Sequence, residues 1–473
     1  MFFRRFYDDG LAQAGYLIGC DQSGEAVVVD AGRDIAPYLA AAAAERLRIT
    51  QVTETHIHAD FVSGTRELAA RTGAAILLSA EGGPDWQYGF AAADGARLLH
   101  DSDRFMAGRI QFDVLHTPGH TPEHLAFLVT DLATSALPVG LLSGDCLFVG
   151  DVGRPDLLER AAKVANTMEA SAHALFASLN RLRALPDFVQ LWPGHGAGSA
   201  CGKALGALPQ STIGYERVAN WGFAATDEDA FVRDVLDGQP EPPAYFAEMK
   251  RINRAGPRIL GERPEATRLD ARRLAAVLDA GDILVDTRSA DAFGNGHAPR
   301  SMNIPLVKSF STWAGTVLPY DRPIYLIAAT QEDAARAVGE MAKIGLDRVG
   351  GYFAIEALAE WSRSGGVLAG VEQATATAIA GRIDGGAVTV VDVRNDSEWA
   401  HGHLRRALHI PLGSLARRAA EIPRGRPVVV HCQGGTRSAI AASILLGQGV
   451  AEVINLRGGY DEWRRAGLPT VED

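Results

Sequence analysis

The chain has 473 residues, of which 47% are hydrophobic and 22% are charged, and its formal net charge at pH 7 is −11. This is the balance of an ordinary globular protein, and its length predicts about three domains. The negative charge argues against a general binder of nucleic acid or anionic membranes, but it does not exclude local basic pockets for an anionic substrate.

Cysteine usage and the N-terminus predict a cytoplasmic location. No two of the four cysteines form a C-x-x-C pair, so the sequence predicts neither a zinc knuckle nor a disulfide framework. The first nine residues, MFFRRFYDD, place acids where a signal peptide needs an apolar core. The richest apolar stretches are broken by Asp, Gly or Pro well short of a membrane span, so we expect no membrane anchor.

The first half of the chain, to about Arg251, alternates between strand and helix patterns. Several of the predicted strands end directly before polar residues, where loops expose chemistry on a rigid scaffold. The predicted strands cover 25–30, 51–55, 74–79, 124–130, 139–142 and 188–192, and the predicted helices cover 64–72 and 161–185, the second of which is stopped by Pro186.

Histidine and aspartate residues gather at three places along this half. His56 and His58 follow the strand at 51–55, His120 lies in the segment TPGHTP, and Asp145 lies in SGD after an apolar strand. A lone H-x-H is more simply explained by hydrogen-bonded imidazoles. Three such elements in order, with Gly or Pro beside His120 and Asp145, predict a metal site instead. Two His and one carboxylate on one face of a metal leave the opposite positions open, which is the arrangement of non-haem Fe(II) oxygenases.

The order of these motifs, which is H-x-H-x-D, T-P-G-H-T, G-D and a late G-H, resembles the metallo-β-lactamase fold from about Phe3 to Met249. The resemblance implies an αβ/βα sandwich with metals at the strand ends. The residues that it places around the first metal position are His56, His58, His120 and Asp145, and those around the second are Asp60, His195 and the residue at position 61.

Position 61 departs from that family pattern, because it is Phe61 and not His. Phenylalanine cannot ligate a metal, so a hydrolytic dinuclear zinc centre is disfavoured. Within the superfamily, persulfide dioxygenases carry a single iron held by two His and one Asp, and the matching positions are His56, His120 and Asp145. His58 is then a close neighbour whose ligation stays open. We therefore expect one Fe(II) per chain, with Zn(II) as the alternative.

Two further segments of this half resemble persulfide dioxygenases. The segment GRPD resembles the G-R-x-D of that subgroup and implies a substrate-pocket role for Arg154 and Asp156, for which a helix-capping ion pair is the alternative. In GHGAGSACGK, small neighbours predict an accessible Cys201, and Lys203 favours its thiolate. Resemblance to multidomain persulfide dioxygenase–sulfurtransferases implies that Cys201 carries sulfur, and a small residue packed in a tight turn is the alternative.

The second half contains an internal duplication. The segment LVDTRSADAFGNGHAPRSMNIPLV at 284–307 matches VVDVRNDSEWAHGHLRRALHIPLG at 390–413, with Asp286 and Asp392 at corresponding positions. Proline-rich stretches at 238–243 and 254–264 indicate linkers before the first copy. The sequence thus predicts three domains, and their boundaries are 1–253, 264–367 and 371–473.

The second copy carries a sulfur-transfer motif. A buried strand at 427–431 leads into the loop CQGGTRS, and a helix is predicted from about Ser438 to Leu446. Cys432 therefore lies among backbone N–H groups at the positive end of a helix, which favours its thiolate and a persulfide on it. Arg437 supplies a fixed cation. The loop residues that are candidate substrate contacts are Gly434, Gly435, whose flexibility lets the backbone curl around sulfur, and Thr436.

This loop resembles the active loop of rhodaneses, and the resemblance covers about Val371 to Thr470. Dual-specificity phosphatases of the same fold carry one more loop residue, so the spacing between Cys432 and Arg437 favours the smaller sulfur pocket. In the first copy, Ala328 stands at the cysteine position and Asp333 at the arginine position. We expect that copy to be an inactive spacer or docking domain, with binding of a substrate's non-reacting part as the alternative.

Together these resemblances imply a persulfide dioxygenase fused to an inactive and an active rhodanese domain. The iron domain is expected to oxidise a small thiol persulfide, carried by glutathione, coenzyme A or a similar thiol, with O2 to sulfite. Sulfur from a Cys432 persulfide would then convert sulfite to thiosulfate, in sulfide detoxification. The alternatives are a glyoxalase-II-like thioester hydrolase tethered to a sulfurtransferase and a non-catalytic sulfur-relay or sensing protein. We expect a homo-oligomer with neither nucleic-acid nor membrane partners.

Overall fold

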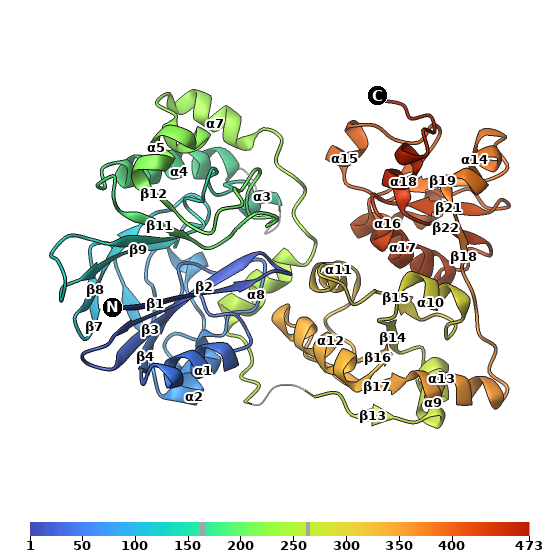
Figure 1. Cartoon of the computed structure of the whole chain (residues 1–473), viewed down its shortest axis with the longest axis horizontal. Coiled ribbons are helices and arrows are strands. Elements are labelled where there is room, and N and C mark those ends of the chain that lie inside the picture. The colour runs from blue at the N-terminus through green and yellow to red at the C-terminus, as the bar shows by residue number, and fades with distance from the viewer. Residues whose placement is uncertain (161–166, 262–264, 473) are drawn as a thin grey trace. The chain divides into compact units, whose positions relative to one another are not determined.

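The computed structural model describes residues 1–160, 167–261 and 265–472. The chain divides into two compact units (Figure 1). The first comprises Met1–Arg263 with Ala342–Gly345, and the second comprises Pro264–Met341 with Leu346–Asp473. Within the described ranges, no helix is both long enough and apolar enough to cross a membrane.

The first unit contains two mixed β-sheets, each with six strands in the described residues. One sheet has the order β1-β2-β3-β4-β5-β6 and the other β12-β11-β10-β9-β8-β7. The strands of the first sheet are β1 (Phe2–Asp8), β2 (Gln13–Cys20), β3 (Glu25–Val29), β4 (Arg48–Thr53), β5 (Ala75–Ser79) and β6 (Arg97–Leu99). The strands of the second are β7 (Arg104–Ala107), β8 (Ile110–His116), β9 (Leu125–Asp131), β10 (Gly140–Gly144), β11 (Gln190–Pro193) and β12 (Ser211–Thr212).

Alternate residues of the central strands point to opposite faces and build separate cores. On β3, Val27 packs with Phe112 and Trp192 in the core between the two sheets. Its neighbour Val28 packs on the outer face with Tyr38 of a covering helix. Because both faces of the strand are covered, β3 reads as a continuous apolar run instead of an alternating pattern. The expected αβ/βα sandwich is confirmed.

Helices cover the outer faces of both sheets (Figure 1). The helices of this unit are α1 (Ala36–Ala44), α2 (Thr65–Thr72), the 3-10 helix η1 (Pro84–Trp86), α3 (Leu157–Arg160), α4 (Met168–Arg183), α5 (Ile213–Ala219), α6 (Trp221–Ala224), α7 (Glu228–Leu236) and α8 (Phe246–Ala255).

Most predicted elements of this half are confirmed, with shifts of one to three residues at their ends. The predicted helix at 161–185 corresponds to α4, and its first six positions lie outside the described residues. The predicted linker at 238–243 has neither helix nor strand, whereas the one at 254–264 starts inside α8, which continues to Ala255. The sequence reading missed the antiparallel hairpins β1–β2 and β7–β8, where charged and aromatic residues hide the alternation.

The second unit contains two parallel sheets with equivalent strand orders, β13-β17-β16-β14-β15 and β18-β22-β21-β19-β20, so the predicted duplication is confirmed. Strands of the first copy are β13 (Arg268–Leu269), β14 (Ile283–Asp286), β15 (Met302–Asn303), β16 (Ile324–Ala328) and β17 (Val349–Ala354). Strands of the second copy are β18 (Glu372–Ala374), β19 (Thr389–Asp392), β20 (Leu408–His409), β21 (Val428–His431) and β22 (Val453–Leu456).

Helices flank both sheets of this unit, as expected for parallel strands joined by crossovers. Those of the first copy are α9 (Ala271–Ala280), α10 (Ala290–Asn295), α11 (Phe310–Val317), α12 (Gln331–Lys343) and α13 (Ile355–Arg363). Those of the second copy are α14 (Ala376–Asp384), α15 (Asp396–Ala400), α16 (Leu412–Arg418), the 3-10 helix η2 (Ala419–Glu421), α17 (Thr436–Gly447) and α18 (Gly459–Arg465). The helix predicted from Ser438 begins two residues earlier, at Thr436.

Candidate metal centre and sulfur-transfer loop

Three predicted metal ligands converge at one edge of the two sheets of the first unit. His56 follows β4, His120 lies between β8 and β9, and Asp145 follows β10. Their ligand atoms all lie within 4.8 Å of one another, and all three residues are buried. Gly144 allows this approach, because its φ is +51° and a Cβ there would meet Thr55 and His124 at under 3 Å.

The donor atoms of this cluster fit a divalent metal. Three donor atoms of the cluster have no hydrogen-bond partner among the described residues. They are the two carboxylate oxygens of Asp145 and the Nε2 of His56. Burial lowers the pKa of His56 and of His120 well below the usual range, so both rings are neutral ligands. Burial also raises the pKa of Asp145 to about 6, against an opposing effect of His195. Buried polar atoms without partners are costly, and two imidazoles with one carboxylate suit a borderline metal ion.

Hydrogen bonds to the opposite ring nitrogens orient both histidines. The Nδ1 of His56 lies 2.9 Å from the hydroxyl of Thr55, and the Nδ1 of His120 lies 3.2 Å from the carbonyl oxygen of Arg154. The Nε2 atoms are left to face Asp145 at 3.8 and 3.5 Å. Partners of this kind fix the ring orientation that a metal ligand needs.

His58 is directed elsewhere. Its Nε2 lies 3.0 Å from the Oδ1 of Asp30, which also accepts a hydrogen bond from the backbone N–H of Thr55. Burial lowers the pKa of His58, but Asp30 outweighs it and the pKa rises to about 9. His58 therefore pairs with Asp30 through its Nε2, while its Nδ1 is buried without a hydrogen-bond partner among the described residues. It is not one of the three residues whose ligand atoms converge.

A second group of potential ligands lies beside the first and contains Asp60, His195 and Cys201, with ligand atoms within 4.8 Å of one another. The Nε2 of His195 lies 3.3 Å from Asp60 and 3.4 Å from Asp145, so the two groups adjoin. In the described part of the chain, neither carboxylate oxygen of Asp60 has a hydrogen-bond partner. Phe61 is buried and its ring contacts the ring of His58, with 4.4 Å between centroids.

Two expectations for Cys201 are wrong. The residue is only 1% exposed, whereas the small neighbours predicted an accessible thiol. Burial, followed by the charges of Asp60 and Asp145, raises its pKa well above the usual range, so it is a thiol and not a thiolate. Lys203 does not oppose this, because its ammonium group donates to the carbonyl oxygens of Asp234 and Asp237. The sequence signal that brings Cys201 to the cluster is the short run of small residues after His195.

Arg154 and Asp156 form a fully buried ion pair next to the metal cluster. The guanidinium binds the carboxylate through two hydrogen bonds of 3.0 and 2.7 Å, and both side chains are 0% exposed. It also donates to the carbonyl oxygens of Ala200, at 2.9 Å, and Pro240, at 2.6 Å. This placement suits residues that hold the loops around His120 and Cys201 together.

The predicted catalytic loop of the second unit surrounds Cys432, which follows β21 and is 1% exposed. The backbone N–H of Gly435 donates to the Cys432 Sγ at 3.1 Å, and the Sγ lies 3.7 Å from the hydroxyl of Ser438. Gly435 has a φ of +107°, a conformation that L side chains rarely adopt. It is the N-cap residue of α17, so the sulfur lies at the positive end of that helix.

Arg437 is held by two residues that the sequence reading did not identify. Glu398 accepts two hydrogen bonds from its guanidinium, at 2.5 and 2.6 Å. Burial lowers the pKa of Arg437, but the bond to Glu398 outweighs it and the net shift is upward. Trp313, on α11 of the first copy, lies under the same guanidinium at 5.6 Å. The inactive copy therefore contacts the catalytic loop directly, which sequence spacing could not reveal.

The first copy has no sulfur chemistry at the equivalent place. Ala328 ends β16, and Asp333 lies in the first turn of α12, where its backbone N–H binds the hydroxyl of Thr330. The copy keeps the supporting ion pair of its neighbour, since Arg288 binds Asp286 as Arg394 binds Asp392. The scaffold is thus retained where the nucleophile is lost.

Comparisons with known proteins agree with this division. The Metallo-beta-lactamase superfamily matches residues 8–195, and the Rhodanese-like domain matches residues 270–361 and 375–466. A crystal structure described as a metallo-beta-lactamase from Staphylococcus aureus subsp. aureus COL is 40% identical to this chain. The similarity covers 75% of this chain and 99% of that chain, with a TM-score of 0.67.

Two curated proteins resemble parts of the chain. A sulfurtransferase of Allochromatium vinosum is 44% identical over 84 residues, which are 18% of this chain and 78% of that protein. A hydroxyacylglutathione hydrolase of Rhodospirillum rubrum is 32% identical over 246 residues, which are 50% of this chain and 80% of that protein. The first of these relatives is named for sulfur transfer and the second for hydrolysis.

Proposed function

The chain belongs to the metallo-beta-lactamase superfamily and carries two rhodanese-like domains, and from this premise we propose that it is a persulfide dioxygenase joined to a sulfurtransferase. The first unit converts R–S–SH, O2 and water to R–SH and sulfite. The second unit transfers persulfide sulfur through Cys432 to sulfite, which gives thiosulfate. The four free cysteines fit a reducing cytoplasm.

The observation that carries the proposal is the set of three converging ligands, His56, His120 and Asp145, beside a His58 that is bound to Asp30. When held by these three residues, Fe(II) would supply redox chemistry and open coordination positions for two reactants. With neutral rings and a single carboxylate as ligands, a bound divalent ion would keep a positive charge, which would favour an anionic persulfide. Phe61 places an apolar ring against His58, where the family pattern has a polar ligand.

The sulfur-transfer step follows from the Cys432 loop. The Cys432 thiolate attacks the outer sulfur of R–S–SH, the S–S bond of the donor breaks, and R–S⁻ leaves and takes a proton from water. Sulfite then attacks the outer sulfur of the Cys432 persulfide, which releases thiosulfate and returns Cys432 to the thiol form. The N–H of Gly435 and the fixed charge of Arg437 stabilise the sulfur anion in both steps.

A thioester hydrolase joined to a sulfurtransferase is the second candidate. It is supported by the 32% identity to a hydroxyacylglutathione hydrolase and by the group of Asp60, His195 and Cys201, which offers ligands for a second metal. Two adjacent metals would activate water for hydrolysis. Phe61, which stands where the family pattern has a ligand to the second metal, weighs against this candidate.

Metal analysis of the purified chain, combined with oxygen uptake on glutathione, coenzyme A and cysteine persulfides, tests the proposal. We expect one iron per chain, and we expect His120→Ala to lose both the iron and the oxygen uptake. His100→Ala is the matched control, because His100 is 68% exposed. Two zinc ions per chain with thioester cleavage and no oxygen uptake would establish the hydrolase instead.

The sulfur-transfer half has a separate test. Cys432→Ser should abolish thiocyanate formation from thiosulfate and cyanide and leave oxygen uptake intact. Cys20→Ser, which removes a thiol at the end of β2, is the control. Thiocyanate formation by Cys432→Ser at the wild-type rate would refute the role of this loop.

A further inference from the structure

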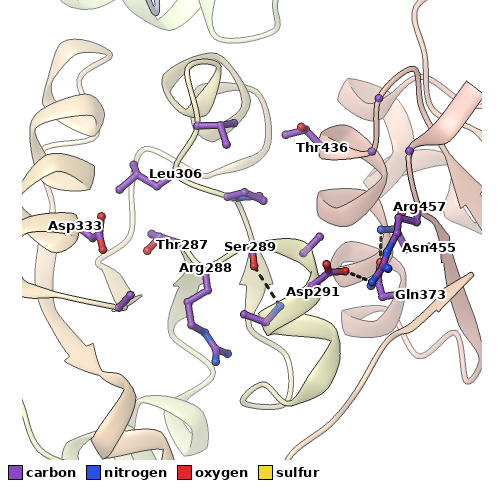
Figure 2. Close-up of a pocket in the computed structure, with 18 of the residues that line it drawn as sticks. Thr287, Arg288, Ser289, Asp291, Leu306, Asp333, Gln373, Thr436, Asn455 and Arg457 are labelled. Atoms are coloured by element: carbon purple, nitrogen blue, oxygen red, sulfur yellow. Dashed lines mark hydrogen bonds and ion pairs between the residues drawn. The ribbon is translucent and has the colours of Figure 1, made fainter. Parts of the chain in front are cut away.

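A pocket of about 610 Å³ lies within the second unit, between the catalytic loop and the first copy. In Figure 2, Thr436 and Arg457 lie on one side of it, and Thr287, Leu306 and Asp333 lie on the other. Its volume is in the range of small-molecule sites, which is about 300–1,000 Å³. The pocket borders the catalytic loop, because Gly434, Gly435 and Thr436 line it. Gly435 connects this wall to the sulfur, since it donates its N–H to the Sγ of Cys432, which is itself 1% exposed and outside the lining.

The pocket carries charged groups of both signs, and they form ion pairs that are exposed to solvent. Arg457 pairs with Asp291 at 2.7 Å, with side chains 56% and 59% exposed. Arg336 pairs with Asp333 at 3.4 Å, with side chains 57% and 32% exposed. Exposed pairs of this kind contribute little to stability, so a ligand with its own carboxylate and ammonium groups can replace the partners at small cost.

A buried acceptor in the lining is a second, independent sign of a ligand. Asn455 is 2% exposed and donates its side-chain N–H to Gln373 at 2.8 Å. Its side-chain oxygen has no hydrogen-bond partner among the described residues. Buried amide oxygens are normally paired, so this one favours a ligand that supplies an N–H group, such as a peptide amide or an ammonium.

We propose that this pocket binds the thiol carrier that delivers sulfur to Cys432, and that the carrier is a zwitterionic thiol of about the size of a cysteine-containing tripeptide. The inference rests on the proposed sulfur-transfer function. The carrier's carboxylates pair with Arg336 and Arg457, and its ammonium group pairs with Asp333 or Asp291. Its outer sulfur then lies against the Gly435 side of the loop.

This arrangement gives the inactive copy a role in binding. Asp333 of the inactive copy stands at the position where the active copy carries Arg437. The inactive copy therefore has no cation there, and its carboxylate lines the pocket beside the catalytic loop of the active copy. The transfer itself is the step described above. The thiolate of Cys432 takes the outer sulfur, the donor S–S bond breaks, and the carrier leaves the pocket as R–SH after protonation by water.

The test measures sulfur transfer to cyanide by the full chain without oxygen, read as thiocyanate after subtraction of the uncatalysed rate, with either glutathione persulfide or thiosulfate as the donor. The readout is selectivity, which is the ratio of kcat/KM for the two donors. We expect Arg457→Gln and Asp333→Asn each to lower selectivity for glutathione persulfide about fivefold, through KM, which is the effect of losing one exposed charge pair. Arg348→Gln is the control and should leave selectivity unchanged. Arg348 is an exposed arginine of the first copy that lies outside the pocket lining.

Donors of different charge separate the possible outcomes. The persulfide of 3-mercaptopropionate lacks an ammonium group, so its KM should rise with Arg457→Gln and not with Asp333→Asn. Unchanged selectivity in both pocket variants would overturn the proposal. A lower KM for coenzyme A persulfide than for glutathione persulfide, with no response to Asp333→Asn, would overturn the zwitterionic carrier. If wild-type protein transfers sulfur from none of these donors, the proposed sulfurtransferase function itself fails.

Discussion

The buried ion pair beside the metal cluster offers a sharp test of how the first unit is held together. Asp156→Asn removes the negative charge opposite Arg154, whose guanidinium is fully buried and keeps only carbonyl partners. Removal of one member of a buried pair costs about 3–5 kcal/mol. Asparagine retains one acceptor, so we expect about 3 kcal/mol, at the lower end of that range. For a unit of this size that corresponds to a fall in Tm of about 6–12 °C.

The same variant should weaken metal binding. The carbonyl oxygen of Arg154 orients His120, and its guanidinium anchors the loop of Ala200. Loss of a partner that orients a ligand typically costs about tenfold or more in metal affinity. Differential scanning calorimetry of the metal-free chain measures the first effect, and competition with a chelating indicator measures the second.

A surface ion pair of the same unit provides the control for Asp156→Asn. Asp113 pairs with Arg104, whose side chain is 59% exposed, so Asp113→Asn should cost less than about 1 kcal/mol. The double variant Arg154→Met with Asp156→Leu should regain part of the stability, because it leaves no unpaired charge. Equal and small falls in Tm for Asp156→Asn and Asp113→Asn would refute the reasoning.

Three further predictions follow from the two sites. His58→Gln should keep the metal, because the Nε2 of His58 binds Asp30, and it should lower the Tm of the first unit because that bond is lost. Mass spectrometry measures the metal content, and loss of metal by this variant would make His58 a ligand. The metal affinity of the metal-free chain should fall about tenfold between pH 7 and pH 5 in a titration, because below a pKa of about 6 the Asp145 carboxyl holds a proton that the metal must displace. A constant affinity over that range would contradict this. Trp313→Ala should lower kcat/KM of sulfur transfer up to about fivefold, since a cation–π contact of about 1 kcal/mol to Arg437 is lost. A Trp313→Phe variant should retain most of the rate, and equal losses in both would exclude the ring contact as the cause.

The sequence predicted those parts of the sites that depend on local order. His56, Asp145 and Cys432 each follow a buried strand, and strand ends meet at one edge of a sheet, so their approximate placement follows from the pattern of apolar runs. The duplicated strand order followed from the repeated motif around Asp286 and Asp392 for the same reason.

Pairings between distant residues escaped the sequence. The partner of His58 is Asp30, 28 positions earlier, and only the folded sheet brings them together. The burial of Cys201 depends on the loop that Arg154 holds, and small neighbours alone predicted the opposite. Trp313 reaches Arg437 from another domain, a contact that no repeat spacing encodes.

The helix that carries the catalytic loop has consequences for how the chain can be shortened. Residues Ser438 to Leu445 of α17 are all buried, and the helix contacts β21 and β22 of its own sheet as well as β15 of the first copy. On that side, the hydroxyl of Ser443 accepts a hydrogen bond from the backbone N–H of Asn303 at 3.0 Å. A fragment that begins at the last domain would expose an apolar flank of this helix to water, with aggregation as the expected result. The copy without a nucleophile therefore covers one flank of the catalytic helix, and we expect a stable fragment of this unit only when the chain is cut before that copy and not after it.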